Sequence, residues 1–312
     1  MRKSLKPPGL APESTIVVIS PASSCKEIRV KSGCETLERL GYRVVRAPRN
    51  PKPDGYFAAP LDERLEEFQD AITNISYQAI FCSRGGYGSA EILDRLKTAG
   101  WKQPKIFCGF SDITSLHIFL WQKWRWVTFH GPLVAGGLDA GENATAGYDP
   151  ESFSRALTVR KGGWSAPLKA ETLVRGSATG ILLGGCITLI ETSIGTPWEL
   201  DTRGAILLLE DRGVKPYQLD RMLLHLQQAG KFKGVRGIVL GEFPDAGAPA
   251  DMPFSIADVC HRILGPLGIP IVYGAPVGHT PRPMLTLPLG VSVRLHASGE
   301  GRLDILEPAV TA

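Results

Sequence analysis

Short apolar runs alternate with amphipathic stretches along the first half of the chain. Residues 61–73 place Leu61, Leu65, Phe68 and Ile72 on one helical face, and residues 26–40 have a similar helix-like pattern. Four apolar runs predict strands, at residues 15–20, 42–47, 78–83 and 105–109. Strands and helices that alternate at this spacing predict parallel βαβ units, with helices on both faces of a sheet.

The second half of the chain contains more strand-like segments. Strands are predicted at residues 178–184, 203–210, 236–242, 269–275, 286–297 and 302–307, and helices at residues 217–229 and 254–264. Residues 136–178 are rich in Gly, Ala and Ser, and their weak apolar periodicity predicts a connection between two domains. We therefore expect an α/β protein with an N-terminal parallel-sheet domain in residues 1–150, a linker in 151–178 and a C-terminal domain with a more mixed sheet in 179–312.

The composition is that of an ordinary globular protein of 312 residues, with 43% hydrophobic and 21% charged residues. Lys and Arg number 35 against 31 Asp and Glu, which gives a net charge of +4. These charges are scattered without a run of five like signs, so they do not indicate a nucleic-acid groove. No segment approaches 18 consecutive apolar residues, so no membrane partner is expected.

The N-terminal segment has no apolar core of a secretory signal before Thr15, which leads us to expect a cytoplasmic protein. The six cysteines form no C-x-x-C pair and are expected to be buried free thiols. The six histidines form no close ligand pair, and H-E-x-x-H is absent. We therefore expect neither a metal ion nor another cofactor.

The segment KIFCGFSDITSLHIFLW, residues 105–121, joins a predicted strand to a helix-like stretch through Gly109 and Ser111. A serine at such a turn is often a nucleophile, because its Oγ is exposed and the N–H groups of the starting helix face it. Capping of the helix by Ser111 is the simpler interpretation. The usual G-x-S-x-G pattern is not matched, since Ile113 stands in place of the second glycine.

A glycine-rich segment, SRGGYGSAEIL at residues 83–93, follows the strand that precedes this turn. Adjacent glycines let a backbone approach a ligand and direct N–H groups into a concavity. A dinucleotide fingerprint is incomplete because Glu91 stands where the third glycine is required, and no P-loop sequence occurs. An anion-binding loop on the same rim as Ser111 fits better. Arg84 would bind either a substrate carboxylate or the carbonyl groups of a loop.

Two residues of the second half are candidates for an acid and a base. Glu210 ends a nearly continuous apolar strand, where a carboxylate is unusual unless it is paired or functional. A helix cap, or an ion pair with Arg212 or Arg221, is the alternative role for Glu210. His279 follows a glycine in a loop between two strands, and histidine is the usual base for a serine nucleophile.

Other histidines compete less well for the role of base. His130 ends an apolar segment, where a histidine is more often buried and satisfied, and His117 lies inside the helix after Ser111. Asp220 and Arg221 are expected to form a structural pair at a helix start. A triad is defined by geometry rather than by chain order, and Ser111, Glu210 and His279 would lie in the cleft between the two domains.

Several short motifs carry a resemblance to a known family. They are DERLEEFQDAI at 62–72, RGGYG at 84–88, GFSDIT at 109–114, HGP at 130–132, LLLED at 207–211, PYQLDRML at 216–223 and GHTPRPMLTLPLG at 278–290. Together they resemble the LD-carboxypeptidases of peptidase family S66, over nearly the whole chain. The resemblance implies an N-terminal Rossmann-like domain with the nucleophile and a β-rich C-terminal α/β domain.

The resemblance also implies a Ser–His–Glu triad, which maps onto Ser111, His279 and Glu210. Members of the family are cytoplasmic serine peptidases without a metal ion, and many are homodimers. The implied substrate is the murein tetrapeptide L-Ala-γ-D-Glu-meso-diaminopimelate-D-Ala, from which the terminal D-Ala is removed during cell-wall recycling.

The same resemblance suggests further roles around the nucleophile. The backbone N–H of Asp112, with that of Gly85 or Gly86, would form the oxyanion hole. Arg84 and Tyr87 are the candidate substrate-binding residues. Additional positive charge at Lys215 and Arg282 would suit an acidic peptide.

Two positions depart from the family pattern and leave the substrate preference open. Cys186 stands where family members often have the Asn of GGNL, and Val214 stands where they often have an acidic residue. One alternative is therefore a microcin C immunity-type carboxypeptidase of the same family, which cleaves an aminoacyl nucleotide. Such an enzyme needs an aromatic side chain, such as Trp164 or Trp198, to stack on the nucleobase of its substrate. A non-catalytic small-ligand-binding protein is the alternative of another class, and a nucleotide-dependent enzyme is a third.

Overall fold

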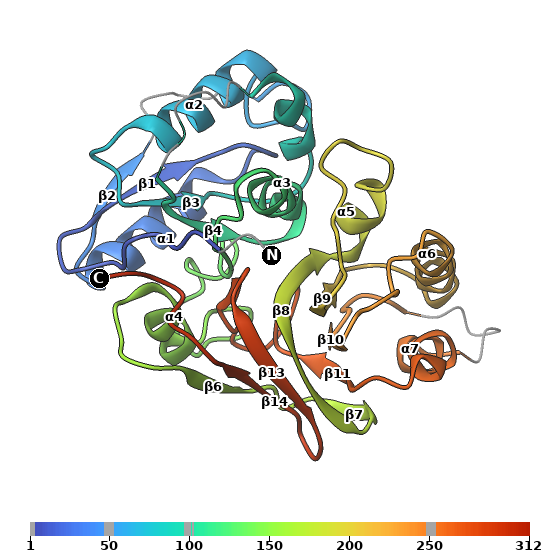
Figure 1. The fold of residues 1–312 in the computed structure, drawn as a ribbon. Coiled ribbons are helices and arrows are strands. Elements are labelled where there is room, and N and C mark those ends of the chain that lie inside the picture. The colour runs from blue at the N-terminus through green and yellow to red at the C-terminus, as the bar shows by residue number, and fades with distance from the viewer. Residues whose placement is uncertain (1–3, 47–52, 97–100, 102, 248–253) are drawn as a thin grey trace.

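Two β-sheets form the framework of the protein (Figure 1). The computed structural model describes residues 4–46, 53–96, 101, 103–247 and 254–312. The first sheet has the strand order β12-β5-β4-β3-β1-β2. Its members are β1 (Thr15–Ile19), β2 (Arg43–Arg46), β3 (Ala79–Cys82), β4 (Ile106–Gly109), β5 (Thr128–His130) and β12 (Leu287–Leu289).

The five N-terminal strands of this sheet are parallel, and the order in which they lie defines where a ligand would bind. β1 pairs with both β2 and β3, so the strand order reverses between β1 and β3. Ligands of open α/β sheets bind at the carboxyl ends of the strands beside such a reversal. The helical segments of this half are α1 (Glu27–Arg39), α2 (Leu61–Thr73), η1 (Ser89–Arg95), η2 (Ser111–Ile113) and α3 (Thr114–Trp124).

The second sheet is mixed and has the strand order β6-β14-β13-β8-β9-β10-β11-β7. The four parallel strands at its centre are β8 (Gly176–Cys186), β9 (Ala205–Glu210), β10 (Gly237–Gly241) and β11 (Ile271–Ala275). Antiparallel strands flank them, namely β6 (Trp164–Pro167), β7 (Glu171–Val174), β13 (Ser292–Ala297) and β14 (Arg302–Ile305). The helical segments of this half are α5 (Ile187–Thr192), α6 (Pro216–Gln228), α7 (Ile256–Leu264) and η3 (Gly265–Leu267).

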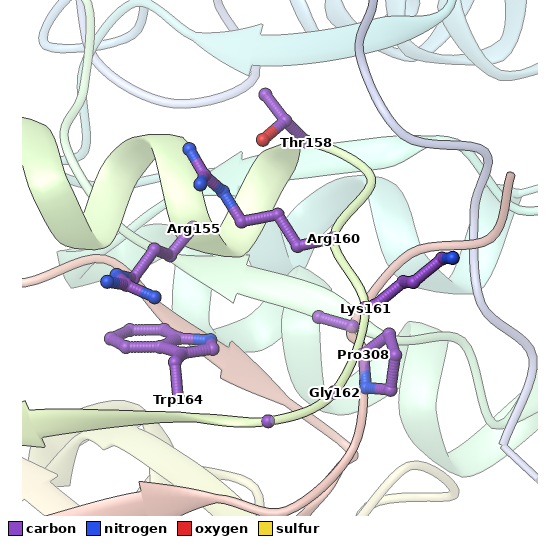
Figure 2. Close-up of a pocket in the computed structure, with 9 residues that line it drawn as sticks. Arg155, Thr158, Arg160, Lys161, Gly162, Trp164 and Pro308 are labelled. Atoms are coloured by element: carbon purple, nitrogen blue, oxygen red, sulfur yellow. The ribbon is translucent and has the colours of Figure 1, made fainter.

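The segment predicted as a linker, residues 151–178, contains regular structure. It includes most of α4 (Pro150–Leu157), the strands β6 and β7, and the start of β8. Their periodicity is weak in the sequence because β6 and β7 are four-residue strands with mostly exposed or half-buried side chains at the two edges of the sheet. A cavity of about 310 Å³ lies between α4 and β6 (Figure 2). The division of the chain into domains at these boundaries remains a prediction.

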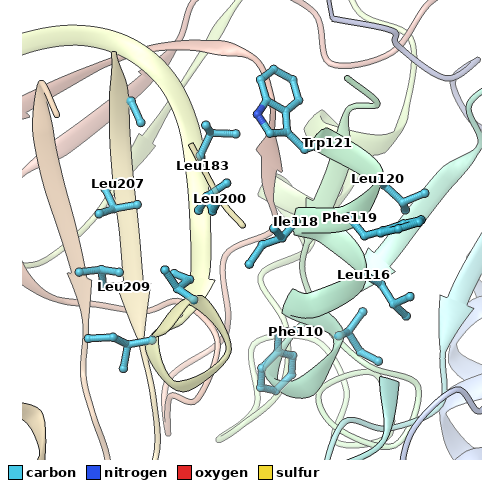
Figure 3. Close-up of a cluster of buried hydrophobic side chains, with 14 of the residues drawn as sticks. Phe110, Leu116, Ile118, Phe119, Leu120, Trp121, Leu183, Leu200, Leu207 and Leu209 are labelled. Carbon is cyan, nitrogen blue, oxygen red and sulfur yellow. The ribbon is translucent and has the colours of Figure 1, made fainter. Parts of the chain in front are cut away.

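Helix α3 lies between the two halves of the molecule (Figure 3). Its first eight residues, Thr114 to Trp121, are all buried, as expected for a helix that is covered on every side. Ile118 belongs to the same cluster of buried side chains as Leu183 and Leu207 of the second sheet. The helix that follows Ser111 therefore couples the first sheet to the second.

The expected α/β fold with a parallel sheet and a second, more mixed sheet is confirmed. One strand prediction is wrong in detail, because residues 286–297 form two strands in different sheets. β12 pairs with β5 of the first sheet, and β13 pairs with β8 of the second. The chain turns between them at Gly290, whose φ is +91° and where a Cβ would lie 2.7 Å from the Trp121 ring. Helix α5 was not expected.

The remaining global expectations can be compared directly with the structure. All six cysteines are free, and all but the partly exposed Cys25 are buried. Among the described residues, no helix is long and apolar enough to cross a membrane.

Candidate active site

Ser111 sits at a sharp turn between β4 and α3. The chain leaves β4 at Gly109, passes through an extended Phe110, and reaches Ser111 with a φ of +64°. This left-handed conformation is strained for a residue with a Cβ. Ser111 stays partly exposed, whereas the residues after it in η2 and the start of α3 are buried. The predicted strand-to-helix turn is confirmed.

The glycine loop after β3 lies against this turn. A Cβ at Gly85 would be 2.8 Å from Cβ of Ser111, 3.0 Å from its Oγ and 3.3 Å from the backbone N of Asp112. A Cβ at Gly86, whose φ is +102°, would be 2.4 Å from Oγ of Ser23. Both positions therefore need glycine, and Gly85 lies closer than Gly86 to the Ser111 hydroxyl.

A buried arginine that the sequence analysis did not single out anchors the same loop. Arg64 of α2 donates from Nη1 to the carbonyl oxygens of Gly88 at 2.8 Å and Pro21 at 3.0 Å. Its guanidinium lies 4.5 Å from the centroid of the Phe57 ring. The available signal was a basic residue on the apolar face of a predicted helix, three positions after Leu61.

The carboxylate of Asp112 points into the protein and holds η1. Its Oδ2 accepts a hydrogen bond from the backbone N–H of Ser89 at 2.8 Å, and its carbonyl accepts one from Ser89 Oγ at 2.6 Å. Burial raises the pKa of Asp112, against the opposing effect of the hydrogen bonds from Ser89. The side chain therefore positions the loop, and only the backbone N–H is near Ser111.

Glu210 and His279 are directly hydrogen-bonded. Oε2 of Glu210 lies 2.7 Å from Nδ1 of His279 and 2.9 Å from the backbone N of the same residue. Glu210 is fully buried at the end of β9, and His279 retains 17% of its side-chain exposure. Since the carboxylate accepts at Nδ1, the tautomer with a proton on Nδ1 is favoured, and Nε2 is then the ring nitrogen without a proton.

The two groups shift each other's pKa. Burial alone would raise the pKa of Glu210, but the charge of His279 and the neighbouring His130 outweigh burial and hold it well below its ordinary value. Burial alone would lower the pKa of His279, but the charge and hydrogen bond of Glu210 raise it above its ordinary value. The pair therefore favours a charged carboxylate and an imidazole that is more basic than usual.

A cleft of about 520 Å³ brings the predicted residues together. Ser111, His279, Gly85 and Arg84 all line it, although they come from distant parts of the sequence. Phe110 also lines the cleft, with its ring 5.0 Å from that of His279 in an edge-on arrangement.

Three arginines, Arg29, Arg84 and Arg212, line the cleft together with one carboxylate, Asp245. Arg29 is paired with Asp139 at 2.5 Å, and Arg212 is paired with Asp245 at 2.6 Å. Arg84 donates to the carbonyl oxygen of Ser24, in the loop between β1 and α1, at 2.6 Å. A hydrogen bond to a loop carbonyl was one of its two predicted roles.

Tyr87 does not line the cleft. Its exposed ring instead packs against Tyr56 and Phe57, with ring centroids 5.3 and 5.9 Å away. The backbone N–H of Tyr87 donates to Oγ of Ser23 at 3.0 Å.

The two tryptophans considered for stacking on a nucleobase do not line the cleft either. Trp164 borders the cavity beside Arg155 (Figure 2), and Trp198 is buried.

The two departures from the family pattern also lie outside the cleft lining. Cys186 is buried, which raises the pKa of its thiol, and its backbone N–H donates to Oγ1 of Thr114 at 3.0 Å. Val214 is half-buried and packs against the hydrophobic core.

Three other charged residues named from the sequence bind partners that the sequence did not indicate. Asp220 pairs with Arg262 of α7 rather than with its neighbour Arg221. Arg282 is bound to Glu242 at 2.8 Å, and Lys215 donates to the carbonyl oxygen of Gly247. These partners are distant in sequence, so neighbouring residues could not reveal them.

Within the described parts of the chain, no cluster of three or more His, Cys, Asp or Glu side chains could hold a metal ion.

Comparisons with known proteins agree with this architecture. Residues 16–131 match the family model of the LD-carboxypeptidase N-terminal domain, and residues 179–295 match that of the C-terminal domain. The probable murein peptide carboxypeptidase of Bacillus subtilis (strain 168) is 32% identical over 296 residues, which cover 94% of this chain and 92% of that protein.

Two further similarities are informative. The microcin C7 self-immunity protein MccF of Escherichia coli is 28% identical over 307 residues, which cover 88% of each protein. The crystal structure of muramoyltetrapeptide carboxypeptidase from Oxalobacter formigenes superposes with a TM-score of 0.84 at 28% identity, and the match covers 96% of this chain and 100% of that one.

The fold and these similarities define a peptidase of the carboxypeptidase type. The chain belongs to the LD-carboxypeptidase family, peptidase family S66.

Proposed function

We propose that this protein is a serine LD-carboxypeptidase that releases the terminal D-Ala of murein tetrapeptide in cell-wall recycling. The observation that carries the proposal is the position of His279. Its Nδ1 is bound to the buried Glu210, and its ring borders the same cleft as Ser111. Nε2 is therefore the ring nitrogen available to take a proton from Ser111.

The first half of the reaction forms an acyl-enzyme. Nε2 of His279 accepts the proton of Ser111 Oγ while Oγ attacks the carbonyl carbon at the L-configured centre of diaminopimelate. Glu210 stabilises the imidazolium that forms. His279 then returns the proton to the departing nitrogen, and free D-Ala leaves.

The developing oxyanion needs preorganised donors. The backbone N–H of Asp112 and that of Gly85 are the proposed donors, with Gly86 the less favoured partner because it faces Ser23. One such donor contributes about 2.7–4 kcal/mol to transition-state stabilisation in known enzymes. In the second half of the reaction, water activated by His279 attacks the acyl carbonyl and Ser111 is released.

The guanidinium of Arg84, which donates to a backbone carbonyl rather than to a carboxylate, supports an acidic peptide as the substrate. The tetrapeptide carries carboxylates on its D-Glu, diaminopimelate and D-Ala residues, and three arginines line the cleft. Arg84 is our candidate for the terminal carboxylate, since a guanidinium binds a carboxylate with two parallel hydrogen bonds. We also propose, as the family resemblance suggests, a cytoplasmic location and a homodimer.

The proposal is tested by incubating the protein with murein tetrapeptide and measuring D-Ala and tripeptide by mass spectrometry. The expected result is equimolar release of the two products by the wild type and no release by Ser111→Ala. An aminoacyl nucleotide serves as the second substrate. Cleavage of the nucleotide without cleavage of the tetrapeptide would replace the proposed substrate by that of a microcin C immunity-type enzyme. Unchanged activity of Ser111→Ala would reject the serine mechanism.

A further inference from the structure

A second buried histidine faces Glu210 from the other sheet. His130 ends β5 and pairs in register with Gly109 of β4, two residues before Ser111. Its Nε2 lies 3.6 Å from Oε1 of Glu210, and both side chains have no solvent exposure. The contact therefore joins the sheet that carries the nucleophile to the sheet that carries the acid.

The two facing atoms have no other partner. Glu210 uses Oε2 for both of its hydrogen bonds to His279, and its Oε1 has no hydrogen-bond partner among the described residues. Neither ring nitrogen of His130 has a partner there either. Buried polar atoms are costly unless they are paired, and a gap of 3.6 Å is too short to admit a bridging water. Each atom is thus the available partner of the other.

We propose that His130 is a positioning residue, which donates a hydrogen bond from Nε2–H to Oε1 of Glu210 and so fixes the carboxylate that orients His279. The proposal rests on the proposed triad and adds a fourth member to it. A small rotation of either side chain closes the gap to hydrogen-bond distance. Glu210 then has both oxygens held, one from each sheet.

His130 acts on the reaction only through Glu210. It does not line the cleft, so it touches neither the substrate nor Ser111 directly. Without its donor, Glu210 is held through Oε2 alone, and the imidazole of His279 loses part of its alignment with Ser111. Glu210 ends a strand of the second sheet, and Ser111 follows a strand of the first. Because His130 belongs to the first sheet, its contact with Glu210 helps to set the position of Glu210 and His279 relative to Ser111.

The test compares His130→Phe, which keeps a ring but removes the donor, with His130→Gln, whose amide nitrogen reaches about as far as Nε2. His117→Phe is the matched control, because His117 is also buried but its Nε2 contacts the carbonyl of Gly109 instead. Steady-state kinetics on the tetrapeptide give kcat and KM. Proton NMR of the low-field Nδ1–H signal of His279 reports its hydrogen bond to Glu210 without any substrate.

We expect His130→Phe to lower kcat about 10- to 100-fold at unchanged KM and to shift or broaden the His279 signal, because small misplacements of reacting groups have effects of that size. His130→Gln should restore both, and His117→Phe should leave the signal in place. An unchanged signal in His130→Phe overturns the proposal, whatever happens to kcat. If His130→Phe does not fold, His130→Asn replaces it in the comparison with His130→Gln, because the shorter amide of Asn cannot reach Oε1 of Glu210. Equal kcat and equal signals in the Asn and Gln variants then overturn the proposal.

The NMR readout separates this proposal from the proposed function. If the wild type does not cleave the tetrapeptide, the His279 signal still shows whether His130 holds Glu210. If the wild type cleaves it and the signal is insensitive to position 130, the proposed function stands and the positioning role is rejected.

Discussion

Glu210 leaves no room for a side chain at Gly278. A Cβ at position 278 would lie 2.3 Å from both Cδ and Oε2 of the carboxylate, and the φ of Gly278 is +59°. The glycine before His279 therefore meets two requirements at once: a left-handed backbone and direct contact with the acid. The same backbone lets the N–H of His279 donate to Oε2 at 2.9 Å, which ties the carboxylate to the loop as well as to the imidazole.

Gly278→Ala is expected to displace Glu210 and lower kcat about 100-fold, since a misplacement of about 1 Å has effects of that size. Gly274→Ala is the matched control. Gly274 also has a positive φ, +86°, but no atom lies within 4 Å of the place where its Cβ would stand. Thermal unfolding and kinetics of both variants separate backbone strain, which both share, from the clash. Equal losses of kcat in the two variants would mean that the contact with Glu210 is unimportant for the reaction.

The pH dependence of activity follows from the His279–Glu210 pair. His279 must be neutral to act as a base, and Glu210 raises its pKa above the ordinary value of about 6.5. The acid limb of kcat/KM should therefore have its midpoint above about 6.5 in the wild type. In Glu210→Gln the negative charge is gone and burial dominates, so the midpoint should move to lower pH.

The same substitution should lower kcat about 10³- to 10⁴-fold, because the amide can favour the wrong tautomer of His279 and cannot stabilise its cation. Kinetics with an activated ester between pH 4 and pH 9 would give both kcat and the midpoint of the acid limb of kcat/KM. A midpoint that moves upward in Glu210→Gln would contradict the electrostatic argument, because removal of a nearby negative charge cannot favour the protonated imidazole.

Gly85→Ala tests the oxyanion site. The added methyl would lie 2.8 Å from Cβ of Ser111 and 3.3 Å from the backbone N of Asp112, in the space that the oxyanion would occupy. We expect kcat to fall about 10²- to 10³-fold, comparable with the loss of one donor. Gly265→Ala is a remote control, because its Cβ would meet only the His261 ring at 3.8 Å. Normal turnover by Gly85→Ala would locate the oxyanion elsewhere.

Most of the buried strands and the proposed reacting groups could be predicted from the sequence, because each had a local signal. Ser111 stood at a strand-to-helix transition, and Glu210 was a charge at the end of an apolar strand. The contacts of these residues had no such signal. That His130 faces Glu210 depends on how two sheets pack, and that Asp220 pairs with Arg262 depends on how α6 and α7 lie together. Tyr87 was chosen for its place in a motif, but its ring turns toward other aromatic residues.

The strain at Ser111 predicts an unusual order of stability. With a φ of +64°, position 111 should favour glycine over alanine, so Ser111→Gly should be about 1 kcal/mol more stable than Ser111→Ala. Ser32, inside α1, is the control position. There the order should reverse, because glycine destabilises a helix by about 1 kcal/mol relative to alanine. Urea unfolding of the four variants measures both differences in the free energy of unfolding, and the same order at both positions would exclude strain at Ser111.

Arg84 makes the preference for a free C-terminal carboxylate testable. Arg84→Met should raise KM for the tetrapeptide about 10- to 100-fold with a smaller effect on kcat, since hydrogen bonds to a charged group contribute about 1.5–3 kcal/mol. The tetrapeptide with a C-terminal amide should respond much less, so the ratio of kcat/KM for acid over amide should fall. Arg43→Met is the control, because Arg43 is exposed, pairs with Glu13 at 2.9 Å and does not line the cleft. If the ratio is unchanged in Arg84→Met, the terminal carboxylate is held by another residue, and Arg84 serves the loop through its hydrogen bond to Ser24.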